Sequence, residues 1–267
     1  MDLLREICQK LEKMSESVAL VFASEGLTTR LLIQTLKRHF DKVLLVEESR
    51  GRVMKKFRNR VRRLGFFNSI SQAIFVLTVP RLLPTKNRID ELLDVNHIVP
   101  DKETKPLLCV ENLNHSEISF NEEKYACNAV FINGPGILRK EFLSQFKVPV
   151  VNIHTGITPA FRGVHGGYWA LCSGRPELFG TTLHFVDAGI DTGGIIDQEI
   201  IEISVQDNYT TYPVLQYLTG LRLLEKNLPA ILGGAVKIKK SISEESRLWH
   251  HPGIFQYLKY RIKKGVK

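Results

Sequence analysis

The sequence lacks the usual marks of secreted, zinc-binding and repetitive proteins. Its four cysteines (Cys8, Cys109, Cys127 and Cys172) are scattered and form no C-x-x-C pair, so neither a zinc site nor a disulfide framework is expected. The N-terminal residues alternate charged and apolar side chains and lack the apolar core of a signal peptide. No internal repeat or low-complexity segment occurs. We therefore expect a cytoplasmic protein without a metal centre.

Acidic residues are missing from one strongly basic stretch. Arg50–Arg63 holds eight Lys or Arg residues and no Asp or Glu. Removing these eight charges from the net charge of +9 leaves +1. The basicity is therefore local, and it does not indicate a general affinity for nucleic acid.

Charged residues are missing from the next stretch, Leu64–Pro80. It is shorter than the roughly 20 apolar residues that a membrane-spanning helix needs. Two interpretations stay open: a buried helix behind a solvated basic helix, or an interfacial helix on an anionic membrane. Trp249–Lys267 mixes aromatic and basic residues in a similar way. Peripheral contact with an anionic membrane through residues 50–83 and 249–267 is therefore one hypothesis.

Apolar runs and helical patterns alternate along the chain, as in α/β proteins. The runs predict strands over Val18–Ala23, Val43–Val46, His97–Val99, Leu107–Val110, Ala129–Ile132, Pro149–Ile153, Thr181–Val186 and Ile195–Ile203. Helical patterns cover Leu27–His39, Arg88–Val95, Lys140–Phe146 and Tyr212–Leu232. We expect a Rossmann-like, doubly wound, mostly parallel sheet. Residues 1–204 would form one catalytic domain with an insertion at about 50–83, and 205–267 a basic helical extension packed on it.

Three polar residues lie at the ends of predicted strands. Asn152 and His154 are two positions apart, so they point to the same face of a strand. Asp191 lies in a glycine-rich loop after the next long strand and can approach the same crevice. Singly, such residues are usually turn formers, structural histidines or caps. Together they could supply an amide donor for an oxyanion, an imidazole that accepts a proton and an orienting carboxylate, which suits acyl transfer to an amine.

The local motifs resemble those of a known family. N-x-H-x-G-x-x-P-x-x-R-G begins at Asn152, and G-x-T-x-H and I-D-T-G-G-I-I follow it. This order and spacing resemble the folate-dependent formyltransferases, which include the glycinamide ribonucleotide, methionyl-tRNA and amino-sugar enzymes. The resemblance covers Asn128–Ser204 well, and Val18–Val46 only as the start of a Rossmann-like fold.

The resemblance implies the formyltransferase fold, 10-formyltetrahydrofolate as formyl donor, and Asn152, His154 and Asp191 as the catalytic trio. His154 would be the general base, Asn152 would stabilise the oxyanion, and Asp191 would orient His154 or a proton-relaying water. The folate would lie between a turn and a loop that supply Asn133, Gly134, Gly136, Ile137, Leu138, Asp187, Ala188 and Gly189. Secondary positions near the site would be Gly163, His165 and His184.

Departures from the family pattern bear on the acceptor. The turn Ala23–Thr28 has one glycine and an acid, which disfavours the phosphate site of a ribonucleotide enzyme. Only 63 residues follow Ser204, and they read as helices rather than the C-terminal barrel of the methionyl-tRNA enzyme, so tRNA is not expected. We expect a primary amine on an amino sugar, nucleotide- or lipid-linked. The alternatives are a phosphoribosylglycinamide formyltransferase, a formyltetrahydrofolate hydrolase, and a membrane-surface binding protein with this fold.

Overall fold

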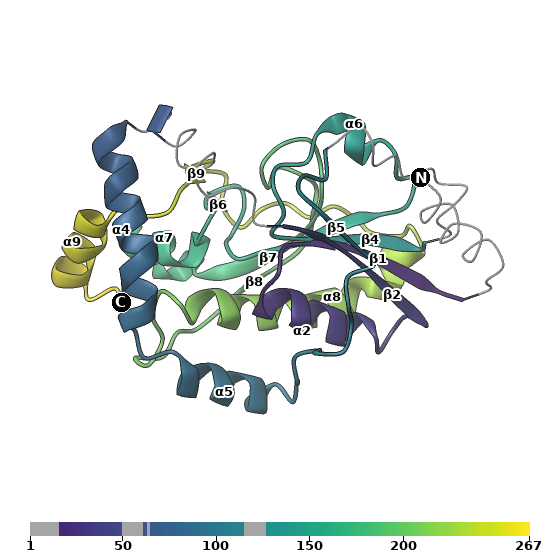
Figure 1. Ribbon diagram of the computed structural model, residues 1–267, viewed down its shortest axis with the longest axis horizontal. Coiled ribbons are helices and arrows are strands. Elements are labelled where there is room, and N and C mark those ends of the chain that lie inside the picture. The colour runs from purple at the N-terminus through teal and green to yellow at the C-terminus, as the bar shows by residue number, and fades with distance from the viewer. Residues whose placement is uncertain (1–15, 50–60, 63–64, 115–126) are drawn as a thin grey trace.

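A seven-stranded sheet forms the centre of the molecule (Figure 1). The computed structural model describes residues 16–49, 61–62, 65–114 and 127–267. The strand order is β3-β2-β1-β4-β5-β7-β8. The strands are β1 (Val18–Ala23), β2 (Lys42–Glu48), β3 (Leu108–Val110), β4 (Ala129–Asn133), β5 (Val150–His154), β7 (Gly180–Phe185) and β8 (Ile195–Ile200).

The first five strands of this order pair in parallel, and β7 pairs antiparallel with both β5 and β8. Every residue of β1 is buried, as expected of a central strand covered on both faces. Apolar clusters lie on the two sides of the sheet, one around Leu31 and Leu221 and the other around Phe22 and Phe142. The predicted Rossmann-like, doubly wound, mostly parallel sheet is confirmed.

Helices cover both faces of the sheet (Figure 1). One face carries α2 (Leu27–Leu36) and α8 (Tyr212–Leu232), and the other carries the short α6 (Lys140–Leu143). Helix α8 packs closely against β5 at Gly220. A Cβ atom at this position would lie 2.2 Å from Cγ2 of Ile153, so only glycine fits there. This close approach fixes β5, the strand that carries Asn152 and His154.

Some predicted elements differ from the structure. His97–Val99 is not a strand: the chain leaves α5 (Lys86–Val95) through Asn96, and His97 adopts a left-handed turn at φ 49°. The helices predicted over Leu27–His39 and Lys140–Phe146 end at Leu36 and Leu143, and the strand predicted over Ile195–Ile203 ends at Ile200. In these three elements the sequence pattern continues beyond the last residue with regular backbone hydrogen bonds.

A second group of elements lies beside the sheet, at the left of Figure 1. It contains α4 (Phe66–Leu82), α7 (Gly166–Ser173), a 3-10 turn (Pro176–Leu178), α9 (Ile254–Lys264) and the paired short strands β6 (Arg162–Gly163) and β9 (Leu248–Trp249). A separate apolar cluster around Phe75, Tyr168 and Trp169 holds this group together.

Helix α4 does not match the interpretation as an ordinary buried helix. Only Ser69, Phe75 and Val79 of its 17 residues are buried. Most of the basic run Arg50–Arg63 lies outside the described residues. Within the described part of the chain, no single helix has the length and hydropathy to cross a membrane; α4 and α5 pass that test only as a pair, bent by 70°.

Candidate active site

A cleft lies at the carboxyl edge of β4 and β5, where a doubly wound sheet places its ligand site. The two strands are parallel neighbours, with Ile132 of β4 opposite Asn152 of β5. The cavity has a volume of about 530 Å³, and Asn152, His154, His184 and Asp191 all line it. The structure therefore brings the predicted catalytic trio into one cleft and adds His184 to it.

Asn152 and His184 face each other on neighbouring strands. Nδ2 of Asn152 donates to Nε2 of His184 at 3.1 Å, and Nδ1 of His184 donates to the Phe185 carbonyl oxygen at 2.7 Å. A carbonyl oxygen only accepts, so Nδ1 carries the hydrogen of the neutral ring and Nε2 is the acceptor. His184 therefore fixes the amide of Asn152 and leaves its second N–H for another acceptor.

His184 is buried. Burial lowers its pKa, and the neighbouring His154 lowers it further, although the Phe185 carbonyl and the Asp191 carboxylate act in the opposite direction. A neutral ring is the form that accepts from Asn152. The lowered pKa thus keeps His184 in the state that holds Asn152.

His154 has a partner at each ring nitrogen. Its Nε2 donates to the Phe161 carbonyl oxygen at 2.7 Å, so Nε2 carries a hydrogen. Its Nδ1 lies 3.4 Å from Oδ2 of Asp191. Nδ1 is therefore the nitrogen that can gain or lose a proton, and a proton gained there faces a carboxylate. Because the Asp191 side chain is 14% exposed and that of His154 only 5%, Asp191 is the more accessible member of the pair.

Asp191 is held in place by the loop that follows β5. It adopts a left-handed backbone at φ 51°, which is uncommon outside glycine and tolerated best by Asn and Asp. The backbone N–H of Gly163 donates to Oδ2 of Asp191 at 2.8 Å, and Arg162 donates to the Ile190 carbonyl oxygen at 3.2 Å. Gly163 has φ 96°, and a Cβ atom there would lie 2.3 Å from the Trp249 carbonyl oxygen. Only glycine therefore fits at position 163, where its backbone N–H holds the Asp191 carboxylate.

Gly156 makes the hydrogen bond between His154 and Phe161 sterically possible. A Cβ atom at this position would lie 2.7 Å from the Phe161 carbonyl oxygen and 2.8 Å from Nε2 of His154. Real Cβ atoms do not come this close, so a side chain here would push the imidazole or the carbonyl out of place. The position of the His154 imidazole therefore depends on the glycine of the N-x-H-x-G motif.

Most of the predicted folate contacts line the same cleft. The end of β4 with the turn after it, and the loop after β7, contribute Asn133, Gly134, Gly136, Ile137, Leu138, Asp187 and Gly189. Two predicted residues do not line the cleft: Ala188, and His165, whose ring stacks on Tyr209 with centroids 4.1 Å apart.

Two of these wall residues are held by neighbouring side chains. Nδ2 of Asn133 donates to Thr28 and Thr29, so its amide ties β4 to the start of α2. The backbone N–H of Gly136 donates to Glu48 at 2.6 Å. A carboxylate at the end of β2 thus positions the turn. This role was not predictable from the sequence, because Glu48 is far from the motifs.

The C-terminal part of the chain also reaches the cleft. Leu248, Trp249 and His250 line it, together with Tyr217 from α8. Pairing of β9 with β6 brings the first two of these residues beside Gly163. These residues were not predicted as part of the site, since no motif links position 249 to position 163. The aromatic content of this segment was the only signal.

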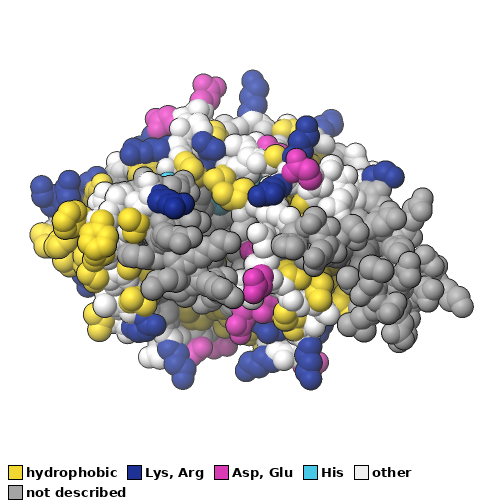
Figure 2. Space-filling view, turned by 45° about the horizontal axis from the view of Figure 1, so that its top comes forward, with side chains coloured by type: hydrophobic (Ala, Val, Ile, Leu, Met, Phe, Trp, Pro, Cys, Tyr) yellow, Lys and Arg dark blue, Asp and Glu magenta, His cyan; other side chains and the backbone are white. Residues whose placement is uncertain are grey.

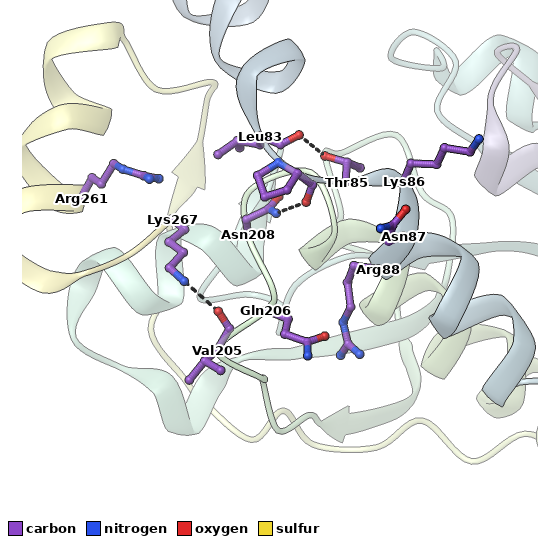
Figure 3. A pocket seen from close by; sticks show the side chains of 11 residues that line it. Leu83, Thr85, Lys86, Asn87, Arg88, Val205, Gln206, Asn208, Arg261 and Lys267 are labelled. Carbon is purple, nitrogen blue, oxygen red and sulfur yellow. Dashed lines mark hydrogen bonds between the residues drawn. The ribbon is translucent and has the colours of Figure 1, made fainter.

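A second cavity of about 540 Å³ lies between the end of α4, the start of α5 and the last residues of the chain (Figure 3). Three of its basic side chains have protein partners: Arg88 donates to Asp207 at 2.8 Å, Arg261 donates to the Tyr257 hydroxyl at 2.9 Å, and Lys267 donates to the Val205 carbonyl oxygen at 2.8 Å. None of Asn152, His154 and Asp191 lines it. This cavity is separate from the catalytic cleft, and its contacts fasten loops together.

Residues 68–214, more than half of the chain, match the family described as formyl transferase. The chain belongs to this family. The match includes Asn152, His154, Gly163 and Asp191, and it confirms the resemblance drawn from the motifs.

Known members match parts of the chain. A methionyl-tRNA formyltransferase of Azobacteroides pseudotrichonymphae is 42% identical over 88 residues, which are 33% of this chain and 26% of that protein. A phosphoribosylglycinamide formyltransferase of Mycobacterium tuberculosis is 36% identical over 102 residues, or 38% of this chain and 47% of the relative. The chain thus covers less than half of either relative.

Solved structures share the fold at low identity. A 4-N formyltransferase of Francisella tularensis has a TM-score of 0.53 at 17% identity, covering 86% of this chain and 75% of that one. An N-formyltransferase of Helicobacter canadensis has a TM-score of 0.51 at 20% identity, covering 86% and 70%. At these identities the likeness concerns the fold alone.

Proposed function

We propose that this protein transfers the formyl group of 10-formyltetrahydrofolate to a primary amine. The observation that carries the proposal is the convergence of the amide of Asn152 with the His154–Asp191 pair in one cleft of the formyl transferase fold. An oxyanion donor and a proton acceptor side by side are what attack on a carbonyl requires.

Asn152, His154 and Asp191 act at different steps of the reaction. The amine nitrogen attacks the formyl carbon, and the free N–H of Asn152 donates to the oxygen that gains negative charge. One such donor contributes about 3–4 kcal/mol in measured cases. The His154–Asp191 pair takes the proton that the amine loses, with Nδ1 of His154 as its resting place. When the bond between the formyl carbon and the folate nitrogen breaks, the pair returns the proton to that nitrogen, so the products are a formamide and tetrahydrofolate.

The cleft suits a flat, partly apolar folate ring. Its walls combine apolar side chains, among them Ile132, Leu138 and Ile153, with the backbone of the turn at Gly134 and of the loop at Asp187. Gly134 has φ 72°, and this left-handed backbone brings main-chain groups to the edge of the cleft without a side chain. The Helicobacter canadensis structure of the same fold is described as a complex with folinic acid and dTDP-3-aminofucose, which supports a folate donor here.

An amino sugar is the acceptor that we propose, linked to a nucleotide or a lipid. The first turn favours this over a ribonucleotide, because its polar groups are engaged internally: Ser24 donates to the Gly134 carbonyl oxygen at 2.9 Å, and Thr29 donates to the Ser24 carbonyl oxygen at 2.6 Å. The turn therefore serves to tie β1 and α2 to β4, and fewer of its groups are left to hold a phosphate.

The test is an assay of the purified protein with 10-formyltetrahydrofolate and a panel of amines that includes nucleotide-linked amino sugars and glycinamide ribonucleotide. Formylation of an amino sugar supports the proposal. Formylation of glycinamide ribonucleotide alone would show that this ribonucleotide, and not an amino sugar, is the acceptor. Release of formate without any amine would indicate a hydrolase. The proposal fails if no amine is formylated and His154→Ala leaves donor turnover unchanged.

A further inference from the structure

Helices α4 and α9 present an exposed apolar surface, here named the α4/α9 surface. Four of its side chains are among the most exposed apolar groups of the described chain: Phe67 (85%), Leu82 (80%), Phe255 (77%) and Ile262 (82%). Phe66, Ile74, Leu77 and Leu258 complete it. Figure 2 shows hydrophobic side chains gathered at the left end of the molecule, with basic side chains beside them. Exposed apolar groups gathered in this way mark an interaction site.

The exposed side chains of the two helices adjoin one another. Phe67 and Ile74 of α4 and Phe255 of α9 line one cavity of about 920 Å³ between the helices. Along α9, Phe255, Leu258 and Ile262 are spaced by three and four residues, so they share one face. Phe67, Ile74 and Phe255 therefore lie close together, and Leu258 and Ile262 continue the apolar face along α9.

The opposite faces of the two helices are firmly packed. Phe75 of α4 contacts the rings of Tyr209 and Tyr257, with centroids 4.8 and 5.2 Å apart. Gln72 donates to the His251 carbonyl oxygen at 2.7 Å. These contacts fix the orientation of α4, so the outward direction of Phe67 and Leu77 is set by the fold.

The charge of the surface has one sign. Neither helix contains an acidic residue. Of the four basic residues of α9, Arg261 donates to the Tyr257 hydroxyl and Lys264 to the Cys172 carbonyl oxygen. Lys259 and Lys263 are exposed beside the apolar groups. Exposed apolar groups flanked by lysines, without acids, are complementary to a bilayer with anionic headgroups.

We propose that the α4/α9 surface docks on an anionic lipid bilayer, with α4 and α9 lying in its interface. A second copy of this chain is a poorer occupant, because face-to-face pairing would bring the lysines of α9 against other cations. The cavity between the helices shares Leu248, Trp249 and His250 with the catalytic cleft. A docked bilayer therefore lies beside a cavity that adjoins the site where the amine would react.

The experiment is co-sedimentation of the full chain with vesicles of phosphatidylcholine, with and without roughly one third phosphatidylglycerol. We expect binding to the anionic vesicles that weakens as salt is added. The double variant F67S/F255S should reduce binding about tenfold or more, since two large exposed apolar groups are lost. K259E/K263E should reduce binding to anionic vesicles by about tenfold, with little effect on phosphatidylcholine.

The matched controls are Val99→Ser and Val205→Ser, which replace highly exposed apolar residues outside the two helices and should bind as the wild type does. The proposal is overturned if the protein stays in the supernatant with both kinds of vesicle, or if F67S/F255S binds as well as the wild type. A dimer in light scattering that F67S/F255S abolishes, without vesicle binding, would instead assign the surface to a second copy. The outcome is independent of formyl transfer, because the readout is lipid binding alone.

Discussion

Nδ1 of His154 lies 3.4 Å from Oδ2 of Asp191, and Nε2 of the same ring donates to the Phe161 carbonyl oxygen. A proton taken up by His154 therefore sits against a carboxylate. Asp191→Asn keeps an oxygen for the Gly163 N–H but removes the negative charge. We expect kcat for formyl transfer to fall about 10²- to 10⁴-fold with little change in KM, as measured by steady-state kinetics.

Asp187→Asn is the matched control for that change. Asp187 lines the same cleft, but its carboxylate accepts from Gly189 and Thr192 within its own loop. This variant should change KM for the folate donor and leave the pH profile of kcat as in the wild type. Equal losses of kcat in both variants would contradict a special role for the His154–Asp191 pair.

His184 is a positioning residue for Asn152, because its Nε2 accepts from the Asn152 amide at 3.1 Å. His184→Phe should lower kcat by about tenfold to a hundredfold with a smaller change in KM, since the amide is then free to rotate away from the oxyanion. His184→Gln, which can still accept, should recover part of the activity. In a double-mutant cycle with Asn152→Ala, the two losses should not add; additive losses would show that His184 acts only through stability.

The positions of Asn152, His154 and Asp191 were predictable because each lies at the end of an apolar run or in a motif of fixed spacing. The wall formed by Leu248–His250 was not, since it depends on two-residue pairing between β6 and β9. Glu48 was missed for a related reason: its contact with Gly136 joins parts of the chain that only the sheet brings together. The sequence of helix α4 lacks the apolar periodicity that distinguishes a buried helix from an exposed one. Which of its side chains are exposed therefore depends on tertiary packing.

Acid should destabilise the fold through two histidines. Burial lowers the pKa of both His184 and His165 below the ordinary value of 6.5. The unfolded chain then binds protons that the folded chain does not, so the stability is fully present above about pH 6.5 and falls as the pH drops below it. The free energy of unfolding, measured by urea titration between about pH 7.5 and about pH 5, should decrease. His165→Phe, which keeps a ring against Tyr209, should flatten this slope; an unchanged slope would refute the assignment.

Asp197 of β8 should be a stability determinant away from the cleft. Burial alone would raise its pKa, but hydrogen bonds from Lys239, Asn227 and Lys226 outweigh this and lower it to about 2. Asp197→Asn should therefore cost about 2 kcal/mol of unfolding free energy near neutral pH. This difference is present above the ordinary pKa of 3.8 and should shrink as the pH falls toward 2. Asp90→Asn, on the exposed side of α5, is the control and should be within about 0.5 kcal/mol of the wild type.

Gly156→Ala tests how far the position of the imidazole depends on one glycine. The added methyl group would meet both the Phe161 carbonyl oxygen and Nε2 of His154 at under 3 Å, so one of them must move. We expect a loss of about 1–3 kcal/mol in unfolding free energy. We also expect a fall in kcat well beyond what that loss explains, because misplacing a catalytic group by about 1 Å can cost about a hundredfold. Gly26→Ala is the matched control, since nothing lies within 4 Å of its Cβ position. A Gly156→Ala protein that is stable and fully active would show that the hydrogen bond from His154 to Phe161 is dispensable.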